Sequence, residues 1–411
     1  MSALKMILPL IAMLMVPAFA DDALLNLMHR FNREIPVQLA QAKSLNISVR
    51  GEAILECYRG IKLSDVYYFG DNIIVTYHDN GLEVSDDEGS IALGLAEIRF
   101  KPRLETSNIV YNGHAYRGYL RAIYKDSPEE IQLINIIDIE DYLKGVLPGE
   151  IGDRTQDEYE AVKAQAIAAR TYAIWKMTDS NSSRKLQSTI ADQLYTGLDS
   201  EKEFLTKGIE ETEGEILIYK NHPIPTYYHA VCGGHTASVE KIWPEKHPAP
   251  YLEGVEDDAY CSWAKSYSWN ETYTPEQLKE AFTKYFKGKG IARDGDFEHI
   301  KDISFRRNSE TGRVDLLTVT TATGVFKEEC DKIRWAIGRS SVPGAILPST
   351  HFNYSIKMAG DTVAEMRING TGNGHGIGMC QCGAIGRARV GFKYDEILKH
   401  YYKHAKIVQI Y

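Results

Sequence analysis

The sequence feature that most constrains the fold is a long helical pattern at residues 157–177. The face opposite its apolar stripe is also rich in alanine. A helix of this composition packs closely on more than one side, so the sequence predicts a central helix covered by other elements. The stripe itself recurs at helical spacing and consists of Tyr159, Val162, Ala166, Ala169, Tyr172 and Ala173.

The residue pattern of 46–137 is typical of a β-rich module. Short runs of β-branched and aromatic residues occur there, and they are too short for helices, so they predict strands. Turn sequences such as Asn112-Gly113 separate these runs. The clearest predicted strands are 73–77, 109–111, 119–124 and 131–137.

Helices and strands are mixed after this module. A short helix is expected at 140–146, closed by Pro148-Gly149. Thr274 and Pro275 mark the start of another helix, which runs to Phe286. Further strands are expected at 215–219, 226–230 and 314–320. The predicted fold class is therefore α+β, with a β-rich N-terminal module followed by a mixed helix and strand catalytic body.

The first twenty residues have the pattern of a signal peptide. Lys5 precedes an apolar run from Met6 to Pro17, and Ala18-Phe19-Ala20 supplies the small residues that a signal peptidase reads. A membrane span needs about 20 apolar residues, so the run is short for an anchor. We expect cleavage after Ala20 and an exported protein, periplasmic or extracellular. Residues 21–45 predict an amphipathic helix and an exit loop.

The charge of the chain argues against one class of partner. The formal net charge is -9, and Lys and Arg form no basic stripe in the sequence. Nucleic-acid phosphates need concentrated basic side chains, so we expect no nucleic-acid partner.

Glu150 is the first candidate for chemistry. It lies between two helical stretches, in Leu147-Pro148-Gly149-Glu150-Ile151-Gly152. Apolar neighbours that partly desolvate a carboxyl group raise its pKa, which suits a general acid at neutral pH. The alternative is a capping or surface glutamate, which spacing alone favours.

Three polar side chains interrupt the alanine-rich helix, namely Lys163, Gln165 and Arg170. Polar groups amid close packing need partners. These residues either bond to neighbouring loops or line a groove that holds a sugar or a carboxylate. Without further knowledge the structural role is favoured.

His229, Cys232 and His235 follow the spacing His-x-x-Cys-x-x-His, and Cys261 lies further along the chain. These four side chains suit a tetrahedral zinc site, which makes zinc the cofactor to consider. Export makes a Cys232–Cys261 disulfide a natural alternative. Two unrelated buried thiols are the third possibility.

Five glycines lie within residues 372–384, around His375 and Gln381. Glycine lets the backbone pass close to a bulky group. The Gly-x-Gly-x-x-Gly pattern of dinucleotide-binding loops is absent from this run. His375 is a candidate acid–base group or substrate donor, and its alternative role is that of a hydrogen-bonded structural histidine.

Taken in this order, the segments resemble the stage II sporulation protein D family. Tyr142 to Glu150 is similar to the family segment YLxGVVPxE, and Glu160 to Ala173 is similar to EALKAQAVAARTYA. Ile151-Gly152 departs from the family, which usually has Met-Pro there. Three further matches are Gln193 to Gly197 with QVYxG, Cys232 to Thr236 with GGxT, and Gly374 to Ala384 with GHGVGxxQxGA.

The resemblance covers roughly residues 95–411. It divides the chain into a signal peptide at 1–20, an N-terminal helix and β-rich region at 21–94, and a family-like catalytic region at 95–411. Some relatives carry zinc near the GGxT turn, which keeps the metal site under consideration.

The resemblance implies a lytic transglycosylase that cleaves the glycan strands of peptidoglycan, with a preference for strands lacking stem peptides. Glu150 matches the position of the family's catalytic glutamate. Two alternatives remain: a non-catalytic enhancer of a cell-wall amidase, and a zinc-dependent wall amidase. The expected substrate contacts are Lys163, Gln165, Arg170, His375 and Gln381.

Overall fold

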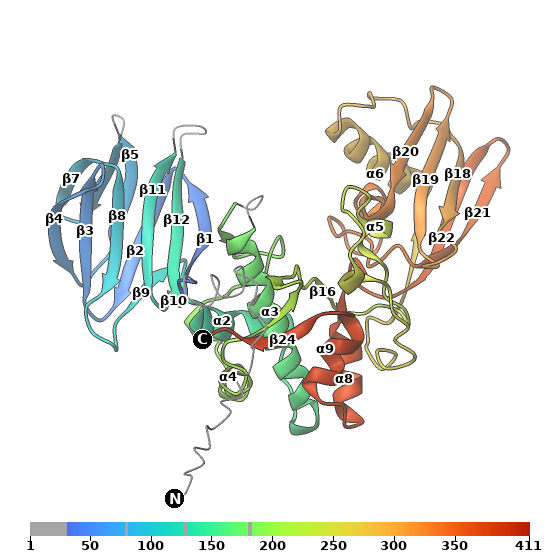
Figure 1. Cartoon of the computed structure of the whole chain (residues 1–411). Coiled ribbons are helices and arrows are strands. Elements are labelled where there is room, and N and C mark those ends of the chain that lie inside the picture. The colour runs from blue at the N-terminus through green and yellow to red at the C-terminus, as the bar shows by residue number, and fades with distance from the viewer. Residues whose placement is uncertain (1–30, 79–80, 126–129, 180–182) are drawn as a thin grey trace, which may run out of the picture.

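The computed structural model describes residues 31–78, 81–125, 130–179 and 183–411. It shows a β-sandwich, a helical body and a second mixed module that is inserted into the body (Figure 1). The predicted signal peptide at 1–20 and the first part of the predicted helix at 21–45 lie outside the described residues. No helix in the described ranges has the length and apolar character needed to cross a membrane.

The sandwich consists of two sheets built mainly from residues 34–138. Ile47, Val75 and Phe100 are buried between the sheets, because alternate residues of each strand point inward. The first sheet contains β1 (Glu34–Ala42), β3 (Ala53–Arg59), β4 (Lys62–Phe69), β8 (Glu97–Pro102), β11 (Tyr119–Lys125), β12 (Glu130–Asp138) and, at its edge, β13 (Leu186–Gln187). The second contains β2 (Ser44–Arg50), β5 (Ile73–His78), β6 (Gly81–Asp86), β7 (Gly89–Leu95), β9 (Asn108–Tyr111) and β10 (His114–Tyr116).

The sandwich differs from the sequence prediction in two places. Residues 34–42, expected in a helix and exit loop, form β1, because Ile35 and Val37 alternate inward with the period of a strand. The predicted boundary at residue 95 falls inside the sandwich, since β8 pairs with both β3 and β11. The sandwich therefore continues to Asp138, where the helical body begins.

The helical body begins with α2 (Ile139–Glu150), which follows β12 directly. Asp138 caps α2 by accepting a hydrogen bond from the Glu140 amide at 2.8 Å. The predicted end at Pro148-Gly149 is wrong, because the helix continues to Glu150 and the Ile151 amide bonds to the Leu147 carbonyl.

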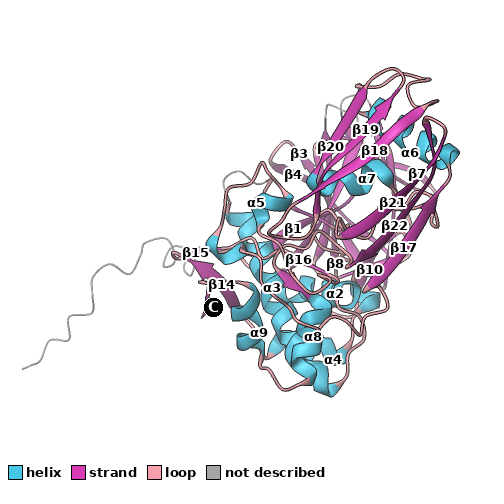
Figure 2. Cartoon of the chain, turned by 90° about the vertical axis from the view of Figure 1, so that its right-hand side faces the viewer, coloured by secondary structure: helices cyan, strands magenta, loops and turns pink. Residues whose placement is uncertain are grey.

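The central helix of the body is α3 (Tyr159–Thr178), and its buried positions lie all around its axis, as the alanine content predicts. The remaining helical elements are η1 (Gln156–Glu158), η2 (Leu198–Ser200), α4 (Glu203–Glu210), α5 (Val239–Ile242), η3 (Pro250–Leu252), α8 (Gln381–Arg389) and α9 (Tyr394–Tyr401). The strands are β14 (Glu215–Tyr219), β15 (His222–Pro223), β16 (Tyr228–His229), β23 (Met379–Cys380) and β24 (Lys406–Gln409). The part of the chain that the structure describes is thus a mixed α+β protein with a β-rich N-terminal part, as predicted (Figure 2).

The inserted module, residues 268–371, has its own hydrophobic core. Thr274 caps its first helix, as the sequence predicts, and the structure adds a capping box with Gln277. The module contains β17 (Ser268–Tyr273), α6 (Pro275–Gly288), β18 (Ile300–Arg307), β19 (Val314–Thr321), β20 (Val325–Glu329), η4 (Cys330–Lys332), α7 (Ile333–Ile337), β21 (Phe352–Ala359) and β22 (Thr362–Thr371).

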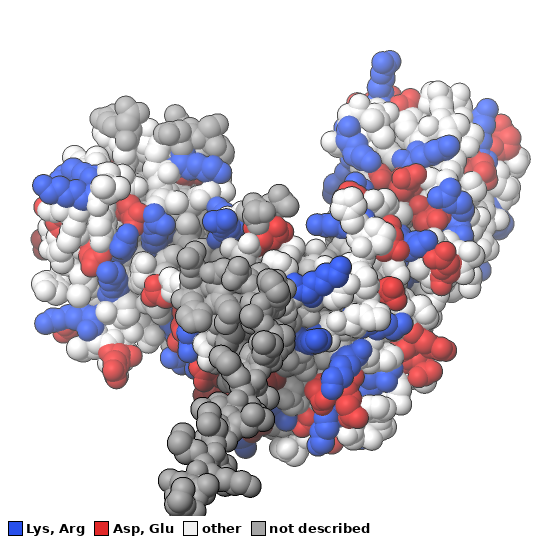
Figure 3. Space-filling model, in the orientation of Figure 1, with Lys and Arg blue, Asp and Glu red and all other residues white. Residues whose placement is uncertain are grey.

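The sandwich and the inserted module stand apart above the helical body, and the space-filling view shows a wide hollow between them (Figure 3). Acidic and basic side chains are interspersed on both lobes of the visible face. This distribution agrees with the absence of a basic stripe in the sequence.

Because the inserted module has a separate core, we expect a substitution in that core to destabilise the module and to leave the rest of the protein unaffected. Phe286 is fully buried and packs against Phe297, with ring centroids 5.7 Å apart. Phe286→Ala should destabilise the module by about 3–5 kcal/mol, since it leaves a cavity among aromatic rings. Hydrogen exchange read by mass spectrometry should show faster exchange within 268–371 and unchanged exchange in the sandwich. Val325→Ala, at an exposed position of β20, is the matched control; equal acceleration throughout the chain would contradict a separate core.

Candidate functional site

The end of α2 is shaped for close contact with a loop. Gly145 and Gly149 lie about one helical turn apart and face the segment 193–197. A Cβ atom on Gly145 would lie 2.6 Å from the Tyr195 ring, and one on Gly149 would lie 3.0 Å from the Leu194 side chain. The two glycines therefore allow the loop to lie directly on the helix that ends at Glu150.

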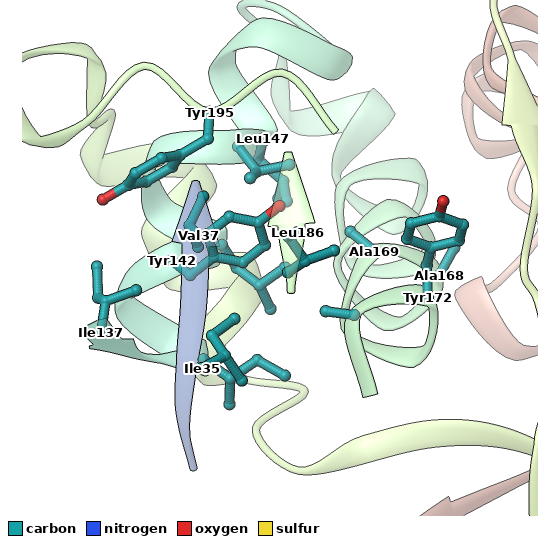
Figure 4. Close-up of a cluster of buried hydrophobic side chains, with 14 of the residues drawn as sticks. Ile35, Val37, Ile137, Tyr142, Leu147, Ala168, Ala169, Tyr172, Leu186 and Tyr195 are labelled. Atoms are coloured by element: carbon teal, nitrogen blue, oxygen red, sulfur yellow. The ribbon is translucent and has the colours of Figure 1, made fainter. Parts of the chain in front are cut away.

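This loop brings a hydrogen-bond donor to the Glu150 carboxyl group. The Leu194 amide donates to Glu150 Oε1 at 2.8 Å. The loop is held in place by Tyr195, whose hydroxyl donates to Asn135 Oδ1 at 2.8 Å and whose ring lies 5.1 Å from Tyr142. Figure 4 shows Tyr195 and Tyr142 in the buried cluster that joins α2 to the sandwich.

The surroundings of Glu150 favour its protonated form. Burial raises the pKa of the Glu150 carboxyl, and hydrogen bonds from the Leu194 amide and Gln381 oppose this in part. No Lys, Arg or His in the described ranges forms an ion pair with it. The side chain remains partly exposed, so a ligand can reach it.

Gln193 and Tyr228 complete a polar network behind this carboxyl, and sequence reasoning gave neither a role. Gln193 accepts a hydrogen bond from the Tyr142 hydroxyl at 3.1 Å and donates to the Tyr228 hydroxyl at 3.1 Å. The charge of Glu150 contributes to raising the pKa of both tyrosines, after the larger effect of burial. The similarity of Gln193 to Gly197 to the family segment QVYxG could have pointed to Gln193, but the prediction gave this segment no function.

Two predicted substrate residues, Gln165 and Gln381, lie beside Glu150. The Gln381 amide donates to the Glu150 backbone carbonyl at 3.0 Å and to Gln165 Oε1 at 3.5 Å. Gln165 is fully buried, and its Nε2 has no hydrogen-bond partner among the residues that the structure describes. An amide donor is therefore left over at the site.

Lys163, predicted to hold a sugar, has other contacts. Its Nζ pairs with Glu160 Oε1 at 2.8 Å and lies over the rings of Tyr159 and Tyr394. These contacts hold the start of α3 against α9. The placement does not fit the predicted sugar contact.

Arg170 does not fit that prediction either, because each nitrogen of its guanidinium group bonds to an acceptor of the protein. Its Nε and Nη2 donate to the two carboxyl oxygens of Glu140 at 2.7 and 2.6 Å. The other donors reach the backbone carbonyls of Ile209 and Glu215 at 3.2 and 3.1 Å. The structural alternative that the sequence left open for this residue is the one that the structure supports.

His375 is held by backbone groups and has no recorded contact with Glu150. The Ile377 amide donates to its Nδ1 at 3.0 Å, so Nε2 carries the proton and donates to the Tyr228 carbonyl at 2.9 Å. Burial lowers the pKa of His375 to about 4. These contacts favour the alternative of a hydrogen-bonded structural histidine.

The structure assembles a cluster that is suited to a metal, but with two ligands that differ from the predicted set. Cys232, Asp257, Cys261 and Cys380 are buried, and their ligand atoms all lie within 4.8 Å of one another. Cys380 was missed because it lies 148 residues from Cys232 in the sequence, and Asp257 because the prediction considered only histidine and cysteine ligands. The Cys232 and Cys261 sulfurs are 3.6 Å apart, and no disulfide joins them.

The two predicted histidine ligands bond elsewhere. His229 Nδ1 lies 3.1 Å from the Ile377 carbonyl oxygen, and His235 Nδ1 bonds to the Thr236 carbonyl. Neither histidine belongs to the cluster of Cys232, Asp257, Cys261 and Cys380 in this structure. The two histidines are close to Cys232 in the sequence, but in the folded chain each ring bonds to a backbone carbonyl.

The raised pKa of Glu150 predicts a dependence of stability on pH. A carboxyl whose pKa rises on folding costs stability once it ionises, so the cost is absent below its ordinary value of 4.5 and present above the raised value. Glu150→Gln should therefore raise Tm at pH 7.5, and this gain should shrink toward pH 4. Thermal unfolding followed by circular dichroism measures both values, with the exposed Glu253→Gln as control. A gain that is equal at both pH values would contradict the burial argument.

Comparison with known proteins places the site in a family. A family model described as Stage II sporulation protein matches residues 127–219, which contain α2, α3 and the 193–197 loop. A model described as Domain of unknown function (DUF8618) matches residues 252–378, which include the inserted module.

Three relatives extend this match. The chain is 33% identical over 307 residues to an uncharacterized protein of Brachyspira hyodysenteriae, covering 72% of this chain and 73% of the relative. It is 30% identical over 335 residues to the amidase enhancer of Bacillus subtilis, covering 74% of this chain but only 46% of that relative. It is 27% identical over 297 residues to the stage II sporulation protein D of Bacillus subtilis, covering 67% and 76%. The chain belongs to the stage II sporulation protein D family.

Proposed function

We propose that this protein is an exported lytic transglycosylase that cleaves the glycan strands of peptidoglycan. Its family supports a function at the cell wall. The observation that carries the proposed reaction is the Glu150 carboxyl, partly buried, with a raised pKa and an amide donor on Oε1. The expected substrate is a glycan strand that lacks stem peptides.

One carboxyl group suffices for this reaction. Protonated Glu150 gives its proton to the glycosidic oxygen, and the bond between that oxygen and C1 of the muramic acid breaks. The resulting carboxylate takes the proton of the C6 hydroxyl, whose oxygen forms a new bond to C1. The products are a shortened strand and a 1,6-anhydro sugar, and Glu150 regains its proton. Water does not attack, so the second carboxylate of ordinary glycosidases is not needed.

The neighbouring amides suit the N-acetyl groups of such a strand. Gln165 has a buried Nε2 donor without a partner in the described part of the chain, and Gln381 lies between Gln165 and the Glu150 backbone. A buried donor left unpaired costs free energy, which a substrate carbonyl would recover. We therefore propose Gln165 and Gln381 as the substrate contacts nearest to the acid.

Replacing the acid tests the proposal directly. Glu150→Gln should lower the release of anhydro-sugar products from denuded glycan strands by a factor on the order of 10²–10⁴, because it removes proton transfer. Mass analysis of the products measures this, with Glu253→Gln as the control that keeps activity. Circular dichroism must show that Glu150→Gln is folded. Release at an unchanged rate by the folded variant would reject Glu150 as the acid.

A second candidate function rests on one relative. The similarity to an amidase enhancer extends over 74% of this chain, so enhancement of a cell-wall amidase is the alternative. In that case the purified protein leaves glycan strands intact, and stem-peptide release by an added amidase increases. The Glu150→Gln variant would then enhance the amidase as well as the unchanged protein does.

The metal-suited cluster argues against the other alternative, a zinc-dependent amidase. Catalytic zinc keeps one coordination position open for water or substrate, whereas structural zinc has four protein ligands. Cys232, Asp257, Cys261 and Cys380 provide four, and all of them are buried. A structural role predicts that a chelator leaves glycan cleavage and amidase stimulation unchanged, provided that the temperature is low enough for the protein to stay folded.

A further inference from the structure

We propose that Cys232, Asp257, Cys261 and Cys380 bind one structural zinc ion. This site would join the segment before the inserted module to the start of α8 and thereby position Gln381 beside Glu150. The proposal concerns metal binding and does not rest on the proposed reaction.

The ligand atoms already have the spacing of a tetrahedral site. Ligands about 2.3 Å from a zinc ion lie about 3.8 Å apart at tetrahedral angles. The Cys232 and Cys261 sulfurs are 3.6 Å apart, and Cys232 Sγ is 3.2 Å from Asp257 Oδ2. Three thiolates with one carboxylate are ligands that zinc accepts.

Backbone amides point at the sulfurs, as expected where thiolates carry charge. The Cys232 and Gly383 amides approach Cys380 Sγ to 3.2 and 3.3 Å, and the Gly234 amide approaches Cys232 Sγ to 3.4 Å. Cys380 is also the N-cap of α8, where the helix dipole stabilises an anion. Without a bound cation the three thiols would be neutral, and the hydrogen bonds from these amides to them would be weaker.

Asp257 is oriented by a second layer of contacts. The Tyr401 hydroxyl donates to Oδ1 at 2.6 Å, and Arg387 Nη2 lies 3.3 Å from the same oxygen. Oδ2 is thereby turned toward the sulfurs. Hydrogen bonds of this kind to the outer oxygen of a ligand are usual around protein metal sites.

The charge of the surroundings matches a bound zinc ion. Three thiolates, one carboxylate and Zn²⁺ sum to -2, and two buried guanidinium groups, Arg387 and Arg313, lie next to them. Arg313 Nη2 donates to the Cys232 carbonyl at 2.9 Å. Its Nη1 has no partner, and no acidic side chain pairs with it, within the described ranges. A buried cation without a counter-charge is costly, and an anionic metal centre supplies one.

The site would join segments that the inserted module separates. Cys232, Asp257 and Cys261 precede the module, Cys380 follows it, and Arg313 comes from within it. Gly383 allows α8 to approach, because a Cβ there would lie 2.1 Å from Asp257 Oδ2. Gln381, next to Cys380, bonds to Glu150, so the metal would fix the part of α8 that reaches the acid.

The zinc content of the full chain tests the site. The protein, purified with a reductant and without chelator, should contain one zinc ion per chain by elemental mass spectrometry. Cys261→Ser and Cys380→Ser should each lower zinc affinity at least about tenfold, since each removes one ligand. The controls Cys57→Ser and Cys330→Ser alter cysteines outside the cluster and should keep full zinc content.

A second measurement on the unaltered protein covers the case in which these variants do not fold. Cobalt exchanged for zinc should give thiolate-to-metal charge-transfer absorption and the visible bands of a tetrahedral centre. Reduced, folded protein that takes up neither metal would overturn the proposal. So would a Cys232–Cys261 disulfide found by peptide mass analysis in protein isolated without reductant. Glu150→Gln should bind zinc normally, so failure of the proposed reaction and failure of this site remain distinguishable.

Discussion

The buried ion pair between Glu140 and Arg170 is the constraint on which the rest of the structure depends. It joins the start of α2 to the middle of α3, and Arg170 also bonds to the carbonyls that end α4 and begin β14. The Tyr411 hydroxyl, at the end of the chain, donates to the same Glu140 carboxyl. Removing one partner of such a pair typically costs about 3–5 kcal/mol, because the other charge stays buried. Since α2 carries Glu140 at one end and Glu150 at the other, this pair helps to set the direction in which the Glu150 carboxyl group is presented.

Local sequence patterns were sufficient for many elements and insufficient for their arrangement. β5, β11, β12, β14 and α6 match their predicted ranges closely, because alternation, β-branching and the Thr274 cap act over a few residues. β1 was missed because its pairing with β12 is set by contacts of Ile35 and Val37 with residues about a hundred positions away. The predicted boundary at residue 95 lies inside the sandwich, because β8 pairs with β3 on one side and with β11 on the other.

The candidate site shows the same division. Glu150 could be singled out from its segment, and Gln165 and Gln381, which were predicted as substrate contacts, lie beside it. For Lys163 and Arg170 the sequence could not decide between a substrate contact and an ion pair within the protein. Their partners, Glu160 and Glu140, are identified only from the folded structure. The ligand set of the cluster combines three distant segments, and spacing along one segment therefore pointed to His229 and His235 instead.

The way in which the inserted module is attached has a consequence for how this architecture can diversify. Val231 pairs with Asn373, and the Gly372 amide bonds to the Tyr267 carbonyl, so the chain leaves and re-enters the body at adjacent points. The module has its own core and joins the body at two adjacent points, so it is connected to the body in the way that a long surface loop is. Such a unit can be lengthened or exchanged during evolution while α2 and α3, which lie outside it, keep their packing. The shape of the lobe on one side of the hollow can therefore change while the surroundings of Glu150 stay the same.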